Sequence, residues 1–378
     1  MEATKKLNGK AVGKWLSNNA IIIMMLAVTL IVGIIHPNFF SGTNMINLFK
    51  NVSIRYIIAL GISGCLITTG NDLSAGRLAG FAACLACIFA QTEGASGKFY
   101  PNMPTISTPL VFVLVIAICA IVGLCNGLVV SYLKVQPFIA TLGMQQVARG
   151  IALYYTGGQN ILQLGDFVDI GQGMVFGIPV PVILVVIITV VVWYIVNHTR
   201  YGRGIYAIGG NRSAAEASGI NTKASIYKSY IINGILVGLA GMIFMARNNA
   251  GLPNGATGYE MTGLTAAIVG GTSFVGGIGT VSGTVAGAFI VGLLENVMNL
   301  RGINAYIQEI VKGAIIVLAV SFDVISKSKK SGKLIIVKEK PEKGAVTHGT
   351  STESARLQTA SKSQCPPEGT QPPDNKQL

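Results

Sequence analysis

The chain has 378 residues, of which 51% are hydrophobic and 11% charged, and its mean hydropathy is +0.58. A soluble domain carries about 25% charged residues, so this composition excludes an ordinary soluble protein. Several apolar stretches reach the roughly 20 residues that cross a bilayer as a helix. They are continuous and not alternating, which argues against a β-barrel. We therefore expect an all-α polytopic protein embedded in a lipid bilayer.

The net charge of +13 would suggest nucleic acid as a partner of a soluble chain. Here the Lys and Arg residues flank the apolar stretches, where they set orientation, so no nucleic acid is expected. The first apolar run has no small-residue cleavage site behind it and is interpreted as a retained anchor.

We predict about ten transmembrane helices, in chain order at residues 20–36, 52–69, 73–91, 109–132, 137–156, 179–197, 225–246, 261–275, 281–300 and 305–325. Residues 1–19 form a basic N-terminal segment, 20–326 the membrane domain, and 327–378 a tail that is first basic and then disordered. The basic ends place both termini in the cytoplasm. The polar loops 92–108 and 157–178 are expected outside.

Two similar polar, Gly-containing segments interrupt the apolar chain, residues 68–77 between the second and third predicted spans and residues 269–279 between the eighth and ninth. Such breaks at corresponding places in two halves of a chain are typical of a transport path. The candidate path residues are Asn71, Asp72, Ser74, Thr272 and Ser273. The alternative is that both segments are tight turns at the cytoplasmic surface, where Asp72 and Arg77 would cost little free energy.

A basic polar stretch at residues 198–224 separates the sixth and seventh spans. Ser213 and Glu216 have the spacing of a capping box, and Gly219 follows where a left-handed helix end is expected. Alanines fill the interval, at Ala214, Ala215 and Ala217. We predict a short helix near residues 213–218 on the cytoplasmic side. It is either a docking element for a cytoplasmic partner or part of a solvated loop.

Few polar residues lie inside the predicted spans. Glu309 and Lys312 are i,i+3 neighbours, so we expect a local ion pair in preference to an ion-coupling site. The asparagines expected to form hydrogen bonds between helices are Asn126, Asn233, Asn296 and Asn299. Five of the six cysteines lie in apolar stretches and are expected to be buried, without a redox or metal role.

No catalytic or cofactor motif is evident. The G-x-x-x-x-G-K-[ST] phosphate-binding motif is absent, and three His residues provide no credible catalytic set. We therefore expect neither enzymatic activity nor a metal or cofactor in this chain, and no ATP hydrolysis by the chain itself.

Several motifs together resemble a known family: GNDLSAGR at 70–77, PFIATLG at 137–143, TRYGR at 199–203, AIGGN at 207–211, VGGTS at 269–273 and IVKGA at 310–314. These resemble the membrane-spanning subunit of bacterial ATP-binding-cassette sugar importers of the ribose/galactose permease type, over about residues 20–325. Residues 72–77 are similar to the galactose/methyl-galactoside branch. The tail after about residue 330 departs from the family.

The resemblance implies a permease subunit in the bacterial inner membrane with three protein partners. These are a cytoplasmic ATPase, an extracytoplasmic sugar-binding protein and a second permease copy. The residues it implies in ATPase docking are Asn211, Ser213, Ala214, Ala215, Glu216, Ala217 and Gly219. The substrate is expected to be galactose or a methyl-galactoside, with ribose or another monosaccharide as the alternative. An ion-coupled secondary carrier using Asp72, Glu295 or Glu309 is the rival class.

Overall fold

The computed structural model describes residues 20–94 and 98–333, so the predictions for residues 1–19 and for the tail beyond 333 lie outside it. The main helices are α2 (Ala20–Ile35), α3 (Gly42–Ile67), α4 (Ala75–Ala90), α5 (Thr108–Ser131), α6 (Pro137–Thr156), α8 (Val180–His198), α11 (Thr222–Asn248), α12 (Tyr259–Val269), α13 (Val281–Leu300) and α14 (Ala305–Lys333). A helix thus occupies each predicted segment. Among the described residues, α3, α5, α8, α11 and α13 are long and apolar enough to cross a membrane.

The β-branched segment 179–197 forms helix α8, as predicted. Val and Ile favour strands on a half-buried sheet, but a single spanning segment must satisfy its own backbone hydrogen bonds, and a helix does so. Pro137 opens α6 in its first turn, where its missing N–H has no helical partner.

Three predicted boundaries are wrong. Helix α14 continues past the predicted end at 325 to Lys333. Helix α3 begins at Gly42, ten residues before the predicted start at 52, because Ser41 caps it by accepting a hydrogen bond from Asn44 N. Hydropathy does not identify residues 42–51 as helical, because this part of α3 contains several polar residues. Helix α12 ends at Val269 and not at 275, because Gly271 has a φ of +88° and turns the chain.

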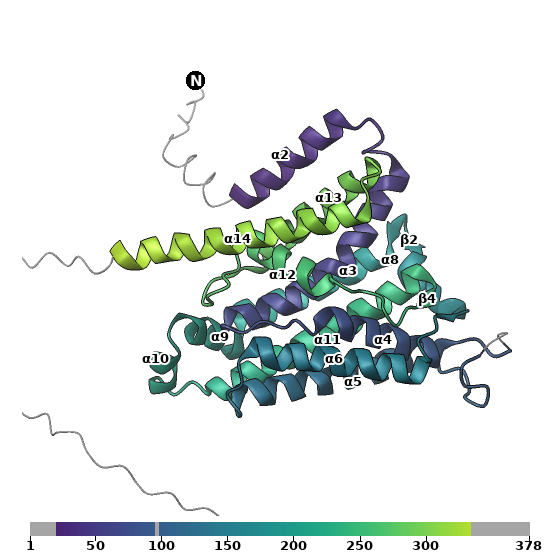
Figure 1. The fold of residues 1–378 in the computed structure, drawn as a ribbon, viewed down its shortest axis with the longest axis horizontal. Helices are drawn as coiled ribbons and strands as arrows, with labels where there is room; N and C mark the ends of the chain where they lie inside the picture. Colours follow the sequence, from purple (N-terminus) through teal and green to yellow (C-terminus); the bar gives the residue numbers. More distant parts are fainter. Residues whose placement is uncertain (1–19, 95–97, 334–378) are drawn as a thin grey trace, which may run out of the picture. The chain divides into compact units, whose positions relative to one another are not determined.

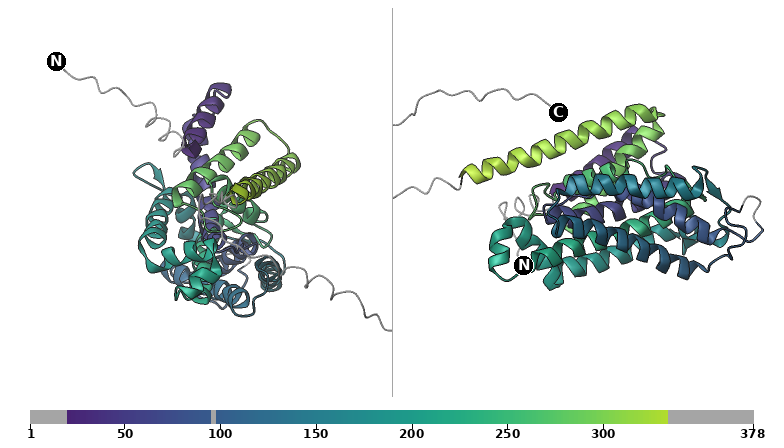
Figure 2. Two further views of the ribbon diagram at one scale, coloured as in Figure 1. Left: turned by 90° about the vertical axis from the view of Figure 1, so that its left-hand side faces the viewer. Right: turned by 60° about the horizontal axis from the view of Figure 1, so that its bottom comes forward.

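Helices α3 and α11 form the centre of the bundle, and α5 and α8 lie largely exposed around it (Figures 1 and 2). Glycines bring α5 and α11 into backbone contact: a Cβ added at Gly234 would lie 2.3 Å from Cys119 O. Close approach through small residues is how helices associate where lipid removes the hydrophobic driving force. The apolar, exposed surfaces of α5 and α8 are those expected of helices that contact lipid.

The two ends of the bundle differ (Figure 1). One end, here called the α10 end, carries α9 (Arg200–Gly210) and α10 (Arg212–Ala217). The opposite end, here called the strand end, carries the short elements β1 (Ile161–Leu162), η1 (Gly165–Val168), α7 (Asp169–Gln172), β2 (Met174–Val175), β3 (Ile178–Pro179) and β4 (Ala250–Gly251).

The loops predicted to be external contact one another at the strand end. Thr92 N donates to Gln163 O at 3.1 Å, which joins the loop after α4 to the loop after α6. Strand β1 pairs antiparallel with β4, which adds the loop after α11. The three loops therefore lie on one side of the bundle, and the basic stretch 198–224 lies at the other.

The cysteines are free thiols among the described residues. Cys65, Cys84, Cys87 and Cys119 are buried, as predicted, but Cys125 is exposed. Helix α5 is apolar on all faces, so hydropathy alone does not tell its buried face from its exposed face.

Candidate functional site

The basic stretch folds into two helices, not the single one predicted. Helix α9 was missed because its four glycines lower helix propensity. Thr199 caps it by accepting a hydrogen bond from Gly202 N at 3.2 Å. A Cβ at Gly202 would lie 1.8 Å from Val196 O, so the glycine permits a close backbone approach that the local pattern does not show.

The predicted capping box at the start of α10 is wrong. Asn211 is the N-cap, and its side chain accepts a hydrogen bond from Ala214 N at 3.0 Å. Ser213 therefore lies inside the helix, where it is exposed. Asn is at least as good an N-cap as Ser, and the extended backbone of Asn211, with φ −157° and ψ 106°, suits that position.

The end of α10 follows the prediction. Gly219 has a φ of +77°. Its N–H donates to Glu216 O and the next N–H, of Ile220, donates to Ala215 O, both at 3.0 Å. This pair of bonds is a Schellman motif, which satisfies two carbonyls that a short helix would otherwise leave free.

Glu216 fastens α10 to the start of α11. Its Oε1 accepts from Thr222 Oγ1 at 2.7 Å and from Arg212 Nε at 3.2 Å. These two hydrogen bonds lower the pKa of Glu216 below its ordinary value. Glu216 is therefore an anion throughout the physiological range, and it holds the helix in a defined orientation.

The remaining surface of α10 faces outward. Of the seven residues predicted to dock, Ala215 is buried at 4% exposure. The other six are exposed: Asn211, Ser213, Ala214, Glu216, Ala217 and Gly219. Most of these side chains are small, so a partner's backbone can approach the helix closely.

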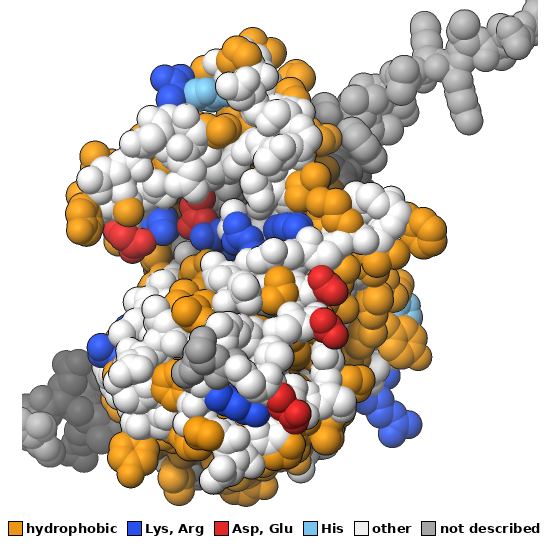
Figure 3. Space-filling model, turned by 90° about the vertical axis from the view of Figure 1, so that its right-hand side faces the viewer, with side chains coloured by type: hydrophobic (Ala, Val, Ile, Leu, Met, Phe, Trp, Pro, Cys, Tyr) orange, Lys and Arg blue, Asp and Glu red, His pale blue; other side chains and the backbone are white. Residues whose placement is uncertain are grey.

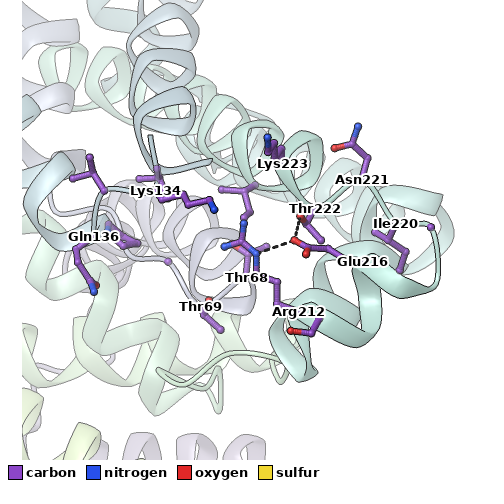
Figure 4. A pocket seen from close by; sticks show the side chains of 17 residues that line it. Thr68, Thr69, Lys134, Gln136, Arg212, Glu216, Ile220, Asn221, Thr222 and Lys223 are labelled. Carbon is purple, nitrogen blue, oxygen red and sulfur yellow. Dashed lines mark hydrogen bonds and ion pairs between the residues drawn. The ribbon is translucent and has the colours of Figure 1, made fainter. Parts of the chain in front are cut away.

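A cavity of about 970 Å³ lies beside α10 (Figure 4). Its walls come from α10, the start of α11, the turn after α3 and the link between α5 and α6. Lys134, Arg212 and Lys223 contribute three cations to the lining, against one acid, Glu216. The cavity therefore has a positive lining beside the predicted docking helix.

The first broken segment is buried inside the bundle. Asp72 is 1% exposed, and its carboxylate accepts hydrogen bonds from Ser74 N at 2.8 Å, Ser74 Oγ at 2.5 Å and Asn233 Nδ2 at 2.7 Å. Asn126 Nδ2 donates to Ser74 Oγ at 3.1 Å. Asn233 lies about 16 Å along α11 from Thr222, at 1.5 Å per residue. The turn is thus within the bundle and not beyond its end.

The predicted hydrogen bonds of the asparagines are confirmed. Asn126 and Asn233 bond to the Asp72 turn, as described above. Asn296 of α13 and Asn44 of α3 join their side-chain amides, at 2.8 and 3.2 Å. Asn299 of α13 accepts from Gln308 of α14 at 2.9 Å. Each of these bonds satisfies polar groups that lipid could not satisfy.

The second broken segment is only partly buried: its hydroxyl residues are inside, whereas Phe274, Val275 and Ile278 are exposed. Thr272 and Ser273 are each 1% exposed. Ser273 Oγ donates to Asp323 Oδ2 of α14 at 3.0 Å. Thr272 Oγ1 is buried and has no hydrogen-bond partner among the described residues. An unpaired buried hydroxyl is unusual in a native structure.

The two broken segments meet, which the sequence did not predict. Gly277 N donates to Ile67 O, the last carbonyl of α3, at 3.0 Å. A second cavity, of about 220 Å³, is lined by Asn71 from the first segment and Phe274 from the second. Thr69 and Gly70 line both this cavity and the larger one beside α10. The predicted path residues and the predicted docking helix therefore border neighbouring spaces.

A charged network lies between α3, α13 and α14. Glu295 Oε2 lies 2.6 Å from Arg55 Nη2, and Glu295 Oε1 lies 3.5 Å from Lys312 Nζ. The predicted local pair is confirmed, since Lys312 Nζ lies 2.8 Å from Glu309 Oε1. Arg55 also lies over the Tyr259 ring, 4.9 Å from its centre. The view of the strand end shows Lys and Arg side chains gathered across a hollow (Figure 3).

A further polar cluster joins α4, α6 and α12. Gln145 Nε2 donates to Glu260 Oε1 at 3.4 Å. Among the described residues, Glu260 Oε2, Arg77 Nη1 and Arg149 Nε are buried without a hydrogen-bond partner. Sequence reasoning missed Glu260 and Arg55, although an ionisable residue inside an apolar segment is itself the signal of a functional position.

Comparison with known proteins agrees with this architecture. Residues 44–320 match the family described as "Branched-chain amino acid transport system / permease component". This match covers most of the described helices. The chain belongs to this permease family. It is therefore a multi-pass membrane protein, as the composition and the apolar helices indicate.

The similar relatives are sugar import permeases, which confirms the resemblance stated from the motifs. The galactose/methyl galactoside import permease protein MglC of Escherichia coli (strain K12) is 37% identical over 332 residues, 86% of this chain and 99% of the relative. The ribose import permease protein RbsC of the same strain is 36% identical over 317 residues, 82% of this chain and 94% of the relative. No solved structure matches the chain.

Proposed function

We propose that the chain is the membrane-spanning subunit of an ATP-driven importer, and that it forms the path for a monosaccharide through the bacterial inner membrane. The observation that carries this proposal is α10, a short capped helix whose exposed surface lies beside a large open cavity. The names of the relatives support import of a sugar. Galactose or a methyl-galactoside is the first candidate substrate and ribose the second.

In this proposal α10 docks in a groove on a separate ATPase subunit. The small exposed side chains of Ala214 and Ala217 permit close contact, and the ion pair of Glu216 with Arg212 holds the helix in one orientation. The adjacent cations Lys134 and Lys223 favour a partner surface with acidic side chains.

The sugar path runs past the two broken segments. A neutral sugar needs hydroxyl and amide partners, which suits Asn71, Asp72, Ser74, Thr272 and Ser273 as candidates. Their surroundings distinguish some of these candidates. Asn71 borders the smaller cavity and the unpaired Thr272 hydroxyl is free to bind, whereas the carboxylate of Asp72 already accepts three hydrogen bonds and holds the turn in shape.

The proposal assigns the α10 end to the cytoplasm and the strand end to the outside, with about ten crossings and both termini inside. The separation of the basic stretch from the three acidic or neutral loops supports this orientation. An extracytoplasmic sugar-binding protein would dock on the loops at the strand end. A second copy of the chain would complete the path.

The test is co-purification of the full chain with its ATPase subunit, followed by ATP-driven uptake of ¹⁴C-galactose or ¹⁴C-ribose into proteoliposomes that contain the sugar-binding protein. The variant Ala214→Glu/Ala217→Glu adds two carboxylates to the exposed surface of α10. The control, Asn102→Glu, adds a carboxylate to an exposed loop residue before α5.

We expect the α10 variant to insert normally but to lose both the ATPase and uptake, while Asn102→Glu keeps both. Retention of the ATPase by the α10 variant would refute docking at α10. Uptake that an uncoupler abolishes while ATP remains plentiful would instead support the rival class, an ion-coupled carrier.

A further inference from the structure

The turn between α12 and α13 is bonded to two distant helices. Gly277 N donates to Ile67 O at the end of α3, at 3.0 Å. Ser273 Oγ and Phe274 N both donate to Asp323 Oδ2 of α14, at 3.0 Å. A displacement of this turn, residues 270–280, therefore acts on α3 and α14 together.

Helix α9 contacts the same turn at two places. Tyr206 Oη donates to Gly279 O at 2.8 Å. One turn further along α9, a Cβ added at Gly209 would lie 1.9 Å from Ile67 O and 2.3 Å from Gly277 N. The backbones of α9, α3 and the turn thus meet without room for a methyl group. Contacts of this density transmit displacement, because close-packed interiors are not compressible.

Helix α9 is joined directly to α10. The single residue Asn211 separates them, and it bonds to both helices: its N–H donates to Ala207 O at 3.0 Å, and its side chain accepts from Ala214 N at 3.0 Å. A force applied to α10 is therefore delivered to α9 next to Gly209, with no flexible linker between them.

We infer that the side of α9 formed by Tyr206 and Gly209 transmits the movement of α10 to the 270–280 turn and to the end of α3, and so to both broken segments. The inference rests on the proposed docking of α10 on an ATPase. Tyr206 and Gly209 act as positioning residues: they contact the turn and not the sugar. Their loss should break the link between ATP hydrolysis and transport while leaving ATPase binding intact.

Helix α9 offers a matched control for each variant. Tyr206→Phe removes the hydroxyl that bonds to the turn, whereas Tyr201→Phe removes a hydroxyl of the same helix that lies 2.8 Å from Ser229 Oγ in α11. Gly209→Ala adds a methyl group at the three-way contact. Gly210→Ala adds the same group at the next position, where nothing lies within 4 Å.

The experiment measures ATP hydrolysed per sugar transported, in proteoliposomes that hold the full chain, its ATPase and the binding protein. The sugar is ¹⁴C-galactose or ¹⁴C-ribose, whichever the wild type accumulates. We expect the ratio to rise about threefold in Tyr206→Phe, the change in an equilibrium constant that one lost hydrogen bond supports. Gly209→Ala should raise it further, and both control variants should match the wild type.

Unchanged ratios in Tyr206→Phe and Gly209→Ala, with the ATPase still bound, would refute the transmission and leave the proposed function standing. A wild-type chain that binds no ATPase would refute the proposed function and the transmission with it. Tyr206→Phe removes one oxygen atom and adds no bulk, so it remains a decisive test if Gly209→Ala reduces the yield of folded protein.

Discussion

The carboxylate of Asp72 should stabilise the first broken segment more than any single apolar contact does. Replacing it with Ala removes the acceptor of two buried donors, Ser74 N and Asn233 Nδ2, because the alanine side chain has no atom that could accept from either. Each orphaned donor costs about 1–3 kcal/mol, so we expect a loss of about 4 kcal/mol. For a domain of this size that loss corresponds to a fall of roughly 6 °C in melting temperature.

Asp72→Asn should be much milder. It keeps one oxygen, which can still accept from Ser74 N, and its new amide faces Asn233. The amide of Asn233 can rotate by half a turn so that its Oδ1 accepts from the new donor. That oxygen has no hydrogen-bond partner among the described residues, so the rotation breaks no other bond of Oδ1. We expect a loss of about 1 kcal/mol.

The assay is thermal unfolding of the purified chain in detergent, followed by loss of the monodisperse peak in size-exclusion chromatography. Asn71→Ala serves as the control, because Asn71 is only partly buried and its backbone carbonyl still accepts from Tyr230 Oη at 3.0 Å. If Asp72→Ala melts with the wild type, or if Asp72→Asn melts as early as Asp72→Ala, the hydrogen-bond argument is wrong.

Three further predictions concern helix packing and α10. Gly61→Ala should strongly lower the melting temperature, because the added Cβ would lie 2.2 Å from Asn233 Oδ1. Gly64→Ala should not, because nothing lies within 4 Å of a Cβ at that position. Equal melting temperatures of the two variants would contradict the close packing of α3 against α11 at Gly61. Asn211→Ala should weaken α10 by about 1 kcal/mol, the usual value of an N-cap, and reduce ATPase co-purification, whereas Ser213→Ala should leave it unchanged. The hydrogen bonds from Thr222 and Arg212 lower the pKa of Glu216 in the folded protein below its unfolded value, near 4.5. The contribution of Glu216 to stability is therefore complete above pH 4.5, and it is lost as the pH falls through the lower folded pKa. Hydrogen exchange of residues 211–222, corrected for the intrinsic rate, should therefore be constant from pH 7 to 5 and rise below 4.5, and a rise near neutral pH would exclude this role.

The helices could be predicted from the sequence because each long apolar segment must satisfy its own backbone in lipid. The same rule identified α8 as a helix despite its β-branched residues. It failed at the polar start of α3 and at the Gly-rich α9, because these helices are stabilised by caps and by close packing, which a hydropathy window does not detect. Six of the seven residues predicted to dock are exposed on α10 or at its ends, yet the N-cap was assigned to Ser213 and not to Asn211, since both residue types suit that position.

The sequence by itself determined the class of protein, the positions of the apolar helices, the family and the existence of two broken segments, because these follow from local composition, spacing and motifs. Only the tertiary structure decided that the breaks meet at Ile67 and Gly277, and that Asp72 lies inside the bundle with Asn233. It also decided that α9 contacts both breaks. These are contacts between residues far apart in the chain, and they depend on how glycines let particular backbones approach. The local sequence does not show which two backbones will approach each other.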